Sequence, residues 1–271
     1  MKFLNRYIVI LFLLAAGRAG AQQATDFTLS KTIHGDIADF TVDNLGNIYT
    51  LDKDNLLEKL DPNGDSLAVF NDVRHFGKIW TIDVTNPLKI LVFYREFSTI
   101  IVLDRFLNIV NTIDLRKLGI LQAKAVGMAY DNNAWVYDEL DNKLKRIGDD
   151  GSLVDQTTDF RQLFDSVPDP SVIVDQGGLV YLYDPAKGVY AFDHYGGLKA
   201  HVPLMGWLDF TVIDKSMLGR SRQKFFKYAL NTLDVQEETL PQYCRDAIKV
   251  RIMPASVYVL KEKGLEIYTR R

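Results

Sequence analysis

The chain of 271 residues contains a single cysteine, Cys244, and only four histidines. One cysteine excludes an intramolecular disulfide and a zinc site built from cysteines. The sequence also lacks an Asn-x-Ser/Thr site for N-glycosylation and a Gly-x-Ser-x-Gly nucleophile elbow. After residue 21, no apolar run approaches the roughly 20 residues that cross a bilayer. These absences remove the most readily recognised catalytic and membrane-spanning classes.

The composition is that of a folded protein rich in strands. Hydrophobic residues make up 47% of the chain and charged residues 25%, which excludes a disordered chain, a coiled coil and a collagen-like fibre. Aromatic residues reach 11%, a proportion that favours β-strands. The formal net charge is −3, so we do not expect the protein to bind nucleic acid.

Residues 1–21 have the pattern of a secretory signal peptide. Lys2 and Arg6 form a charged start, an apolar run follows from Tyr7 to Ala16, and Ala19-Gly-Ala21 offers small residues for cleavage. We therefore predict that cleavage near Ala21 leaves residues 22–271 as a single domain, periplasmic or secreted. An uncleaved membrane anchor is the alternative, but the apolar run is too short to span a bilayer. The single cysteine and the missing glycosylation site favour a bacterial periplasm.

The chain after the signal peptide repeats a pattern of strands and turns. The clearest copy runs from Phe40-Thr-Val-Asp43 through Gly46-Asn-Ile-Tyr-Thr-Leu-Asp52 to Leu57-Glu-Lys-Leu60, and it ends at the turn Asp61-Pro-Asn-Gly64. Each stretch alternates apolar and polar residues and stops at turn residues, which is typical of antiparallel strands.

Six copies of this pattern follow one another. Their third strands end at Leu60, Leu103, Ile147, Phe192, Ala229 and Ile267. A four-stranded unit recurring about every 40 residues is typical of a β-propeller blade. The sixth copy stops after its third strand, and residues 25–33 form a spare strand before the first copy. We predict an all-β, six-bladed β-propeller of four-stranded antiparallel blades, with this N-terminal strand completing the last blade; a two-sheet sandwich or two small β domains is the alternative.

The motifs Asp43-x-x-Gly-Asn-Ile-Tyr-x-Leu-Asp52 and Leu57-x-Lys-Leu-Asp-x-x-Gly64 resemble those of NHL-type six-bladed propellers. The likeness covers nearly all of residues 22–271, is clear in copies one, three and four, and is faint in copy five. These motifs are structural, so the resemblance implies a fold and leaves the activity open.

An aspartate closes the first strand in five of the copies, at Asp43, Asp83, Asp131, Asp175 and Asp214. These residues could form a ring of carboxylates. Each also precedes a turn, where an aspartate accepts backbone N–H groups and fixes the turn. We favour the turn-setting interpretation.

His34 and His75 occupy equivalent places before the first strands of copies one and two. We expect both on interblade loops of one face, where two imidazoles could bind a metal. Matching positions in the other copies supply no third ligand, and catalytic zinc typically takes three protein ligands. We therefore predict no cofactor, and keep a metal-dependent hydrolase or lyase around these histidines as the alternative function. His194 is expected to be solvated in a turn.

Positive charge is concentrated near the C-terminus, because residues 215–271 carry 12 basic and 6 acidic side chains. Arg220, Arg222 and Lys224 alternate with polar residues, so we expect them on one face of a strand with Lys227 nearby. Such a patch can steer an acidic partner or a lipid headgroup. A solvated face without a partner is the alternative.

Trp80 and Trp207 begin the first strands of copies two and five. They could rim the mouth of the channel as contacts for a partner, or pack between blades. Together with the basic residues, they form our predicted surface for a protein partner.

The export signal, the rigid propeller and the missing catalytic constellation lead to one hypothesis. The protein is expected to be a non-enzymatic binding or scaffold protein of the bacterial cell envelope that presents its faces to a protein partner. An outer-membrane assembly or secretion complex is one such partner. Peripheral association with a membrane is compatible with this hypothesis, and residues 22–271 contain no predicted transmembrane segment.

Overall fold

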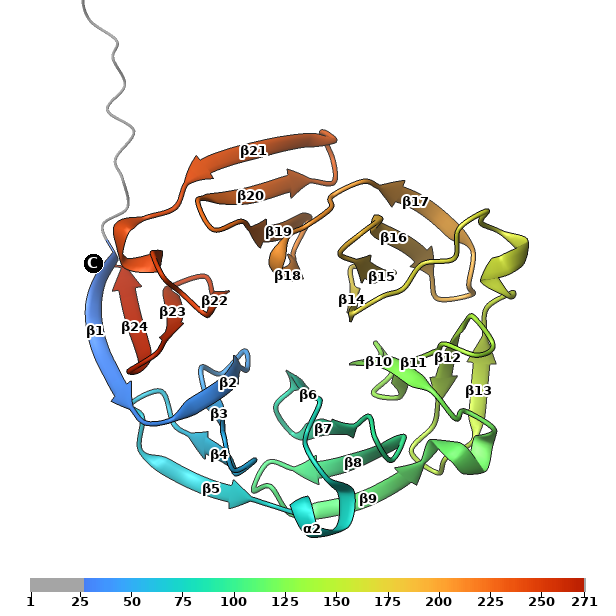
Figure 1. The fold of residues 1–271 in the computed structure, drawn as a ribbon, viewed down its shortest axis with the longest axis horizontal. Helices are drawn as coiled ribbons and strands as arrows, with labels where there is room; N and C mark the ends of the chain where they lie inside the picture. Colours follow the sequence, from blue (N-terminus) through green and yellow to red (C-terminus); the bar gives the residue numbers. More distant parts are fainter. Residues whose placement is uncertain (1–26, 271) are drawn as a thin grey trace, which may run out of the picture.

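The computed structural model describes residues 27–270, which form a ring of six four-stranded antiparallel sheets around a central channel (Figure 1). The predicted all-β six-bladed propeller is therefore confirmed. From the channel outward, blade 1 contains β2 (Ile37–Val42), β3 (Ile48–Asp52), β4 (Leu57–Leu60) and β5 (Ser66–Phe70), and blade 2 contains β6 (Thr81–Asn86), β7 (Lys89–Tyr94), β8 (Thr99–Asp104) and β9 (Ile109–Asp114). Blade 3 contains β10 (Ala123–Met128), β11 (Ala134–Asp138), β12 (Lys143–Ile147) and β13 (Leu153–Gln156), and blade 4 contains β14 (Val172–Gln176), β15 (Leu179–Asp184), β16 (Gly188–Asp193) and β17 (Leu198–Val202). Blade 5 contains β18 (Leu208–Ile213), β19 (Ser216–Arg220), β20 (Lys224–Ala229) and β21 (Asp234–Thr239).

Blade 6 is assembled from both ends of the described chain. Its inner strands are β22 (Lys249–Ile252), β23 (Ser256–Lys261) and β24 (Gly264–Arg270), and its outer strand is β1 (Phe27–His34). β1 and β24 are antiparallel and pair from Phe27 opposite Arg270 to His34 opposite Gly264. The N-terminal strand thus completes the last blade, as predicted. The predicted signal peptide, residues 1–21, and the first two residues of the predicted strand 25–33 lie outside the described residues.

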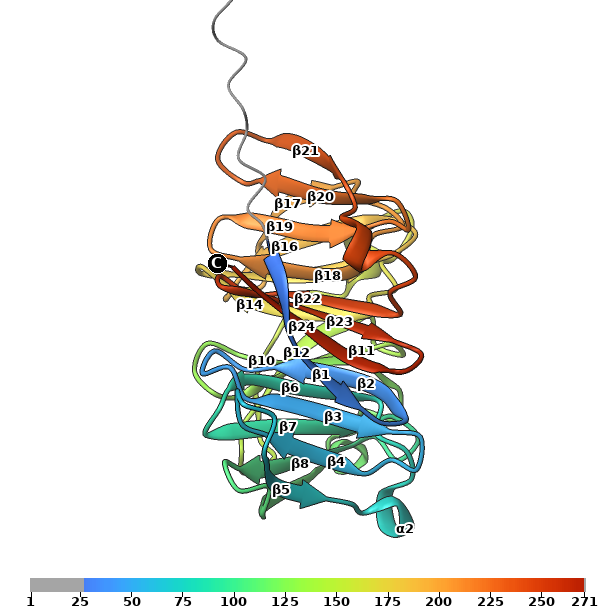
Figure 2. The ribbon, with the colours of Figure 1, turned by 90° about the vertical axis from the view of Figure 1, so that its left-hand side faces the viewer.

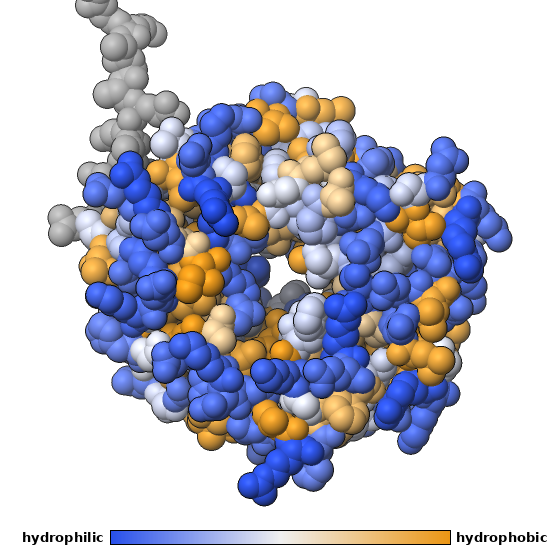
Figure 3. Space-filling model, viewed as in Figure 1, coloured by the Kyte–Doolittle hydropathy of each residue, from blue (hydrophilic) through white to orange (hydrophobic). Residues whose placement is uncertain are grey.

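The chain crosses from the outer strand of each blade to the inner strand of the next on one side of the disc, which we call the connecting face. These crossings hold α2 (Val73–Phe76), η1 (Leu115–Leu118), η2 (Phe160–Gln162) and η3 (Gln242–Cys244). The turns between the first and second strands of each blade lie on the opposite side, the hairpin face. Figure 2 shows the disc edge-on with α2 on the connecting face. Figure 3 shows the channel opening there between mostly hydrophilic side chains.

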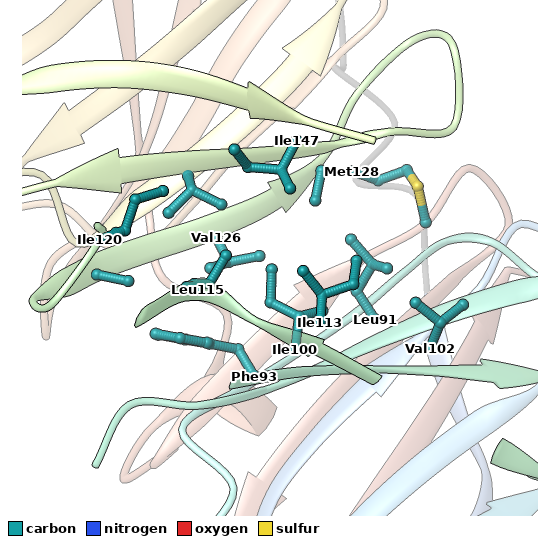
Figure 4. Packing of buried hydrophobic residues seen from close by; sticks show 13 residues of the cluster. Leu91, Phe93, Ile100, Val102, Ile113, Leu115, Ile120, Val126, Met128 and Ile147 are labelled. Atoms are coloured by element: carbon teal, nitrogen blue, oxygen red, sulfur yellow. The ribbon is translucent and has the colours of Figure 1, made fainter. Parts of the chain in front are cut away.

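The hydrophobic core is divided among the six interfaces between blades. Successive side chains of a strand point to opposite faces of a sheet, so each blade packs against both neighbours. Between blades 2 and 3, for example, Phe93 and Ile100 belong to the same buried cluster as Val126 and Ile147. Leu115 of η1 is part of this cluster too (Figure 4). This arrangement explains why the middle strands are apolar on both faces, as β7 and β8 are. Within residues 27–270, no helix is long and apolar enough to span a membrane.

Candidate functional site

The predicted basic run does not lie on one strand. β19 ends at Arg220, β20 begins at Lys224, and the residues between them form the turn that joins the two strands. The expectation of one charged strand face is therefore wrong, because the turn reverses the chain inside the run. Arg222 and Lys227 are exposed, and Lys224 pairs with Glu237.

Arg220 is buried, with 3% of its side chain exposed. Its Nε donates to Asp209 Oδ2 at 2.5 Å, and its Nη2 donates to the carbonyls of Ala247 and Ile248 at 3.2 and 3.0 Å. Asp209 also accepts the N–H of Val250 at 2.8 Å. Arg220 therefore ties blade 5 to blade 6, and its guanidinium is not available to a partner at the surface.

The two predicted tryptophans have different environments. Trp80 is 54% exposed, and the guanidinium of Arg95 lies 4.8 Å from its ring centroid. Trp207 is 8% exposed and stacks on Phe226, with the ring centroids 5.2 Å apart. A Cβ at Gly219 would lie 2.6 Å from Cε3 of Trp207, so only glycine lets the indole lie against β19. Trp207 packs between blades, and only Trp80 is placed to contact a partner.

The histidines predicted as weak metal ligands do not come together with a third ligand. His34 is exposed at the end of β1, and His75 is exposed in α2, where it pairs with Asp72. Across residues 27–270, no group of three His, Cys, Asp or Glu side chains is placed to hold a metal ion.

The recurrent aspartates divide into three kinds. Asp43 and Asp131 accept backbone N–H groups of their own turns, as predicted. Asp83 accepts the N–H of Thr85 in its own turn and the N–H of Met128 in blade 3. Asp175 accepts the N–H of Tyr130 in blade 3 and none from its own turn among the described residues, so it joins blades instead of setting a turn. Asp214 has a φ of 51° in its two-residue turn and accepts no hydrogen bond through its side chain from residues 27–270. The turn-setting prediction is therefore wrong for Asp175 and Asp214, and the Asp214 carboxylate is free to meet another molecule.

Asp214 lies at a crevice of about 350 Å³ between blades 5 and 6. The apolar part of the wall comprises Ile213, Leu218, Phe225, Phe226 and Ile252. The polar part comprises Asp214, Ser216, Lys227, Gln236 and Glu238. Of the predicted partner-binding residues, only Lys227 lines this crevice.

The strand register explains why these side chains share one face of blade 5. Phe225 pairs with Glu238, and Lys227 pairs with Leu218 on one side and with Gln236 on the other. Residues opposite each other in an antiparallel ladder point to the same face. The alternation in β20 therefore places Phe225 and Lys227 together, and this alternation is present in the sequence itself.

The crevice exists because blade 6 does not cover the outer part of blade 5. All six residues of β21 are exposed. Toward the connecting face the gap is filled, since Leu240 and Cys244 pack against Val250 and Val259 of blade 6. Burial raises the pKa of the Cys244 thiol to about 12, so it stays protonated and unreactive. The crevice is therefore closed toward the connecting face and open along β21, where charged side chains of both signs line it.

The rim carries one ammonium group and two carboxylates. Lys227 forms no ion pair with the described residues, and the same holds for Asp214 and Glu238. An apolar floor with a few convergent polar groups is the usual make-up of a binding site. The crevice can receive an apolar side chain and pair with charges on either side of it.

The structure also corrects the expected position of His194. Only 18% of its side chain is exposed, its Nε2 lies 2.9 Å from Asp175 Oδ1, and its ring stacks on Tyr130 with centroids 3.9 Å apart. The three residues come from two blades, so no local sequence pattern reveals the cluster.

Comparisons with known proteins identify a fold. No protein-family model matches the chain, and no curated protein matches it. The structure is similar to a catalytically inactive virginiamycin B lyase from Staphylococcus aureus with quinupristin, at 10% identity and a TM-score of 0.66 over 91% of this chain and 100% of that one. It is also similar to the WD40 domain of Neurospora crassa Pan2, at 11% identity and a TM-score of 0.60 over 88% of this chain and 79% of that one. BamB from Moraxella catarrhalis is similar at 12% identity and a TM-score of 0.50, over 86% and 82% of the two chains. At these identities the likeness shows the propeller fold alone, and the NHL-type resemblance stays a prediction.

Proposed function

We propose that this protein is an exported, non-enzymatic binding module of the bacterial cell envelope and that the crevice between blades 5 and 6 receives a segment of a protein partner. The observation that carries the proposal is the crevice itself, an apolar floor left open in a ring whose blades otherwise pack together. The pattern of residues 1–21 supports export.

The wall of the crevice defines the chemistry of the partner segment. Leu218, Phe225 and Ile252 offer an apolar surface for one aliphatic or aromatic side chain. Asp214 and Glu238 together outnumber Lys227, so the rim favours a segment with a basic residue beside its apolar anchor. We infer an extended segment, because the crevice lies between the sheets of two blades.

Similarity to a lyase does not change this proposal, since one fold hosts many functions and the site decides. The alternative enzyme around His34 and His75 has no third ligand in the described part of the chain. A propeller that binds protein needs a rigid surface and a pocket for an anchor, and the crevice supplies both.

The proposal is tested by affinity capture of residues 22–271 from solubilised native envelopes. We expect a stoichiometric protein partner that is lost when Glu238→Lys reverses the net charge of Asp214, Glu238 and Lys227 from negative to positive. Glu96→Lys is the matched control, because Glu96 is also exposed and unpaired among the described residues but lies between β7 and β8 in blade 2. Both changes are at the surface and should alter the free energy of unfolding by less than about 0.5 kcal/mol. Equal capture by both variants, or no partner with the unchanged protein, would refute the proposal.

A further inference from the structure

A second cavity lies on the hairpin face at the mouth of the central channel. Its volume is about 270 Å³, and four blades contribute to its wall. Asn44 comes from blade 1, Thr85 and Asn86 from blade 2, Tyr130 and Asn132 from blade 3, and Asp175 from blade 4. Because the inner strands converge here, turns far apart in sequence meet around one space.

The wall of this cavity carries a single charged residue, whose carboxylate is already engaged by several partners. Asp175 is its only charged lining residue, and 3% of the Asp175 side chain is exposed. Its Oδ2 accepts the N–H of Tyr130 at 3.0 Å and Nε1 of Trp135 at 2.8 Å, and its Oδ1 meets His194. A carboxylate with three donors has little capacity left for a cation.

Tyr130 is held rigidly at the edge of the cavity. Its ring stacks on His194 with an interplanar angle of 7°. Its hydroxyl accepts a hydrogen bond from Arg146 Nη1 at 2.7 Å, and the same nitrogen donates to Asp131 at 2.9 Å. The tyrosine is nevertheless 57% exposed. A side chain fixed at both ends and still exposed is preorganised for contact, because binding costs it little conformational entropy.

The free hydrogen-bonding groups of the cavity are uncharged amides and hydroxyls. The Asn44 amide and the Thr85 hydroxyl form no hydrogen bond with other described side chains. Asn132 Oδ1 accepts a hydrogen bond from Asn86 Nδ2 at 2.8 Å, which leaves the Asn132 amino group free to donate. Amides and hydroxyls both donate and accept, so together they match a ligand with several hydroxyl groups.

We propose that this cavity binds a neutral polyhydroxylated ligand of the size of one sugar ring, with Tyr130 as the contact surface and Asn44, Thr85 and Asn132 as hydrogen-bonding partners. The volume lies just below the range of about 300–1,000 Å³ for drug-sized ligands, which fits a single ring. The wall discriminates against anionic sugars, because its lining contains no basic residue and an anionic group would lose its hydration without gaining a counter-charge.

The test is isothermal titration of residues 22–271 with glucose and N-acetylglucosamine, and with glucose 6-phosphate and glucuronate as charged counterparts. We expect at least one neutral sugar to bind, and both charged sugars to bind at least about tenfold more weakly. Absence of binding by both neutral sugars at millimolar concentrations would overturn the proposal, as would equal affinity for the charged ones.

Two variants locate the site. Asn132 has a φ of 66°, so Asn132→Gly removes the amide while keeping the backbone conformation. Asn142→Gly is the matched control, because Asn142 has a φ of 52° and lies in a turn on the connecting face. Asn132→Gly and the isosteric Thr85→Val should each weaken sugar binding about fivefold, as the loss of one hydrogen bond predicts. Asn142→Gly should leave the affinity within about twofold. Unchanged binding by both cavity variants would place the ligand elsewhere and overturn the assignment.

Discussion

Replacing Arg220 tests whether this residue stabilises the contact between blades 5 and 6 or binds a partner. In Arg220→Met the side chain keeps an unbranched apolar stem and loses the hydrogen bonds to Asp209, Ala247 and Ile248. Removing one partner of a buried ion pair costs about 3–5 kcal/mol. Asp209 keeps the N–H of Val250, and 15% of its side chain is exposed, so water can partly solvate it. We therefore expect a loss of about 3 kcal/mol from the free energy of unfolding.

Thermal unfolding followed by circular dichroism measures this loss. For a protein of this size, about 3 kcal/mol corresponds to a fall in Tm of roughly 6–12 °C. Arg222→Met is the matched control, because Arg222 is two residues away, exposed and unpaired among the described residues. It should shift the free energy by less than about 0.5 kcal/mol. If Arg220→Met melted together with Arg222→Met, the link between blades 5 and 6 would not exist as described.

Three further outcomes follow from the fold. Deleting residues 27–33 removes nearly all of β1 and should lower Tm for the whole ring in a single transition, because blade 6 loses its outer strand; an unchanged Tm would contradict the closure. Ellman's reagent should label Cys244 only after unfolding, since burial raises its thiol pKa to about 12, and rapid labelling of the native protein would contradict that burial. Backbone and side-chain hydrogen bonds lower the pKa of Asp61 and Asp104 in the outer turns. Their stabilisation is complete above the unfolded pKa of about 3.9 and is lost as the pH falls through the lower folded pKa, so Tm should fall in acid, and less steeply in Asp61→Asn/Asp104→Asn.

The fold was predictable because the information for it is local and repeated. A strand is predicted from the alternation of apolar and polar residues, and a turn from residues such as Asp61 and Gly64. The strands of each blade can therefore be predicted from the sequence of that blade alone. The closure by β1 was predictable from the number of strands. The sixth copy has only three strands, and the N-terminal strand belongs to no other copy. The short α2 was not predicted, because a single turn of helix leaves no periodic pattern.

The sites were less predictable because they depend on contacts between blades. Nothing near Arg220 in the sequence shows that Asp209 and the carbonyl of Ile248 surround it. Trp207 is core because Gly219 on the neighbouring strand leaves room for its ring. Asp175 and His194 contact each other within blade 4, and His194 stacks on Tyr130, which belongs to blade 3. The charges of residues 215–271 predicted that one sector of the disc is basic. Only the register of the strands in the structure shows which of these side chains are buried and which are exposed.

Photo-crosslinking from inside the crevice between blades 5 and 6 would show whether it holds a segment of a protein partner. A photo-reactive phenylalanine analogue would replace Phe225, which lines the crevice, or Val110 in β9, which is 65% exposed on the rim of blade 2. We expect that illumination of intact cells gives one discrete protein adduct from position 225 and none from position 110, and that Glu238→Lys abolishes the adduct. Adducts from both positions, or from neither, would contradict this expectation.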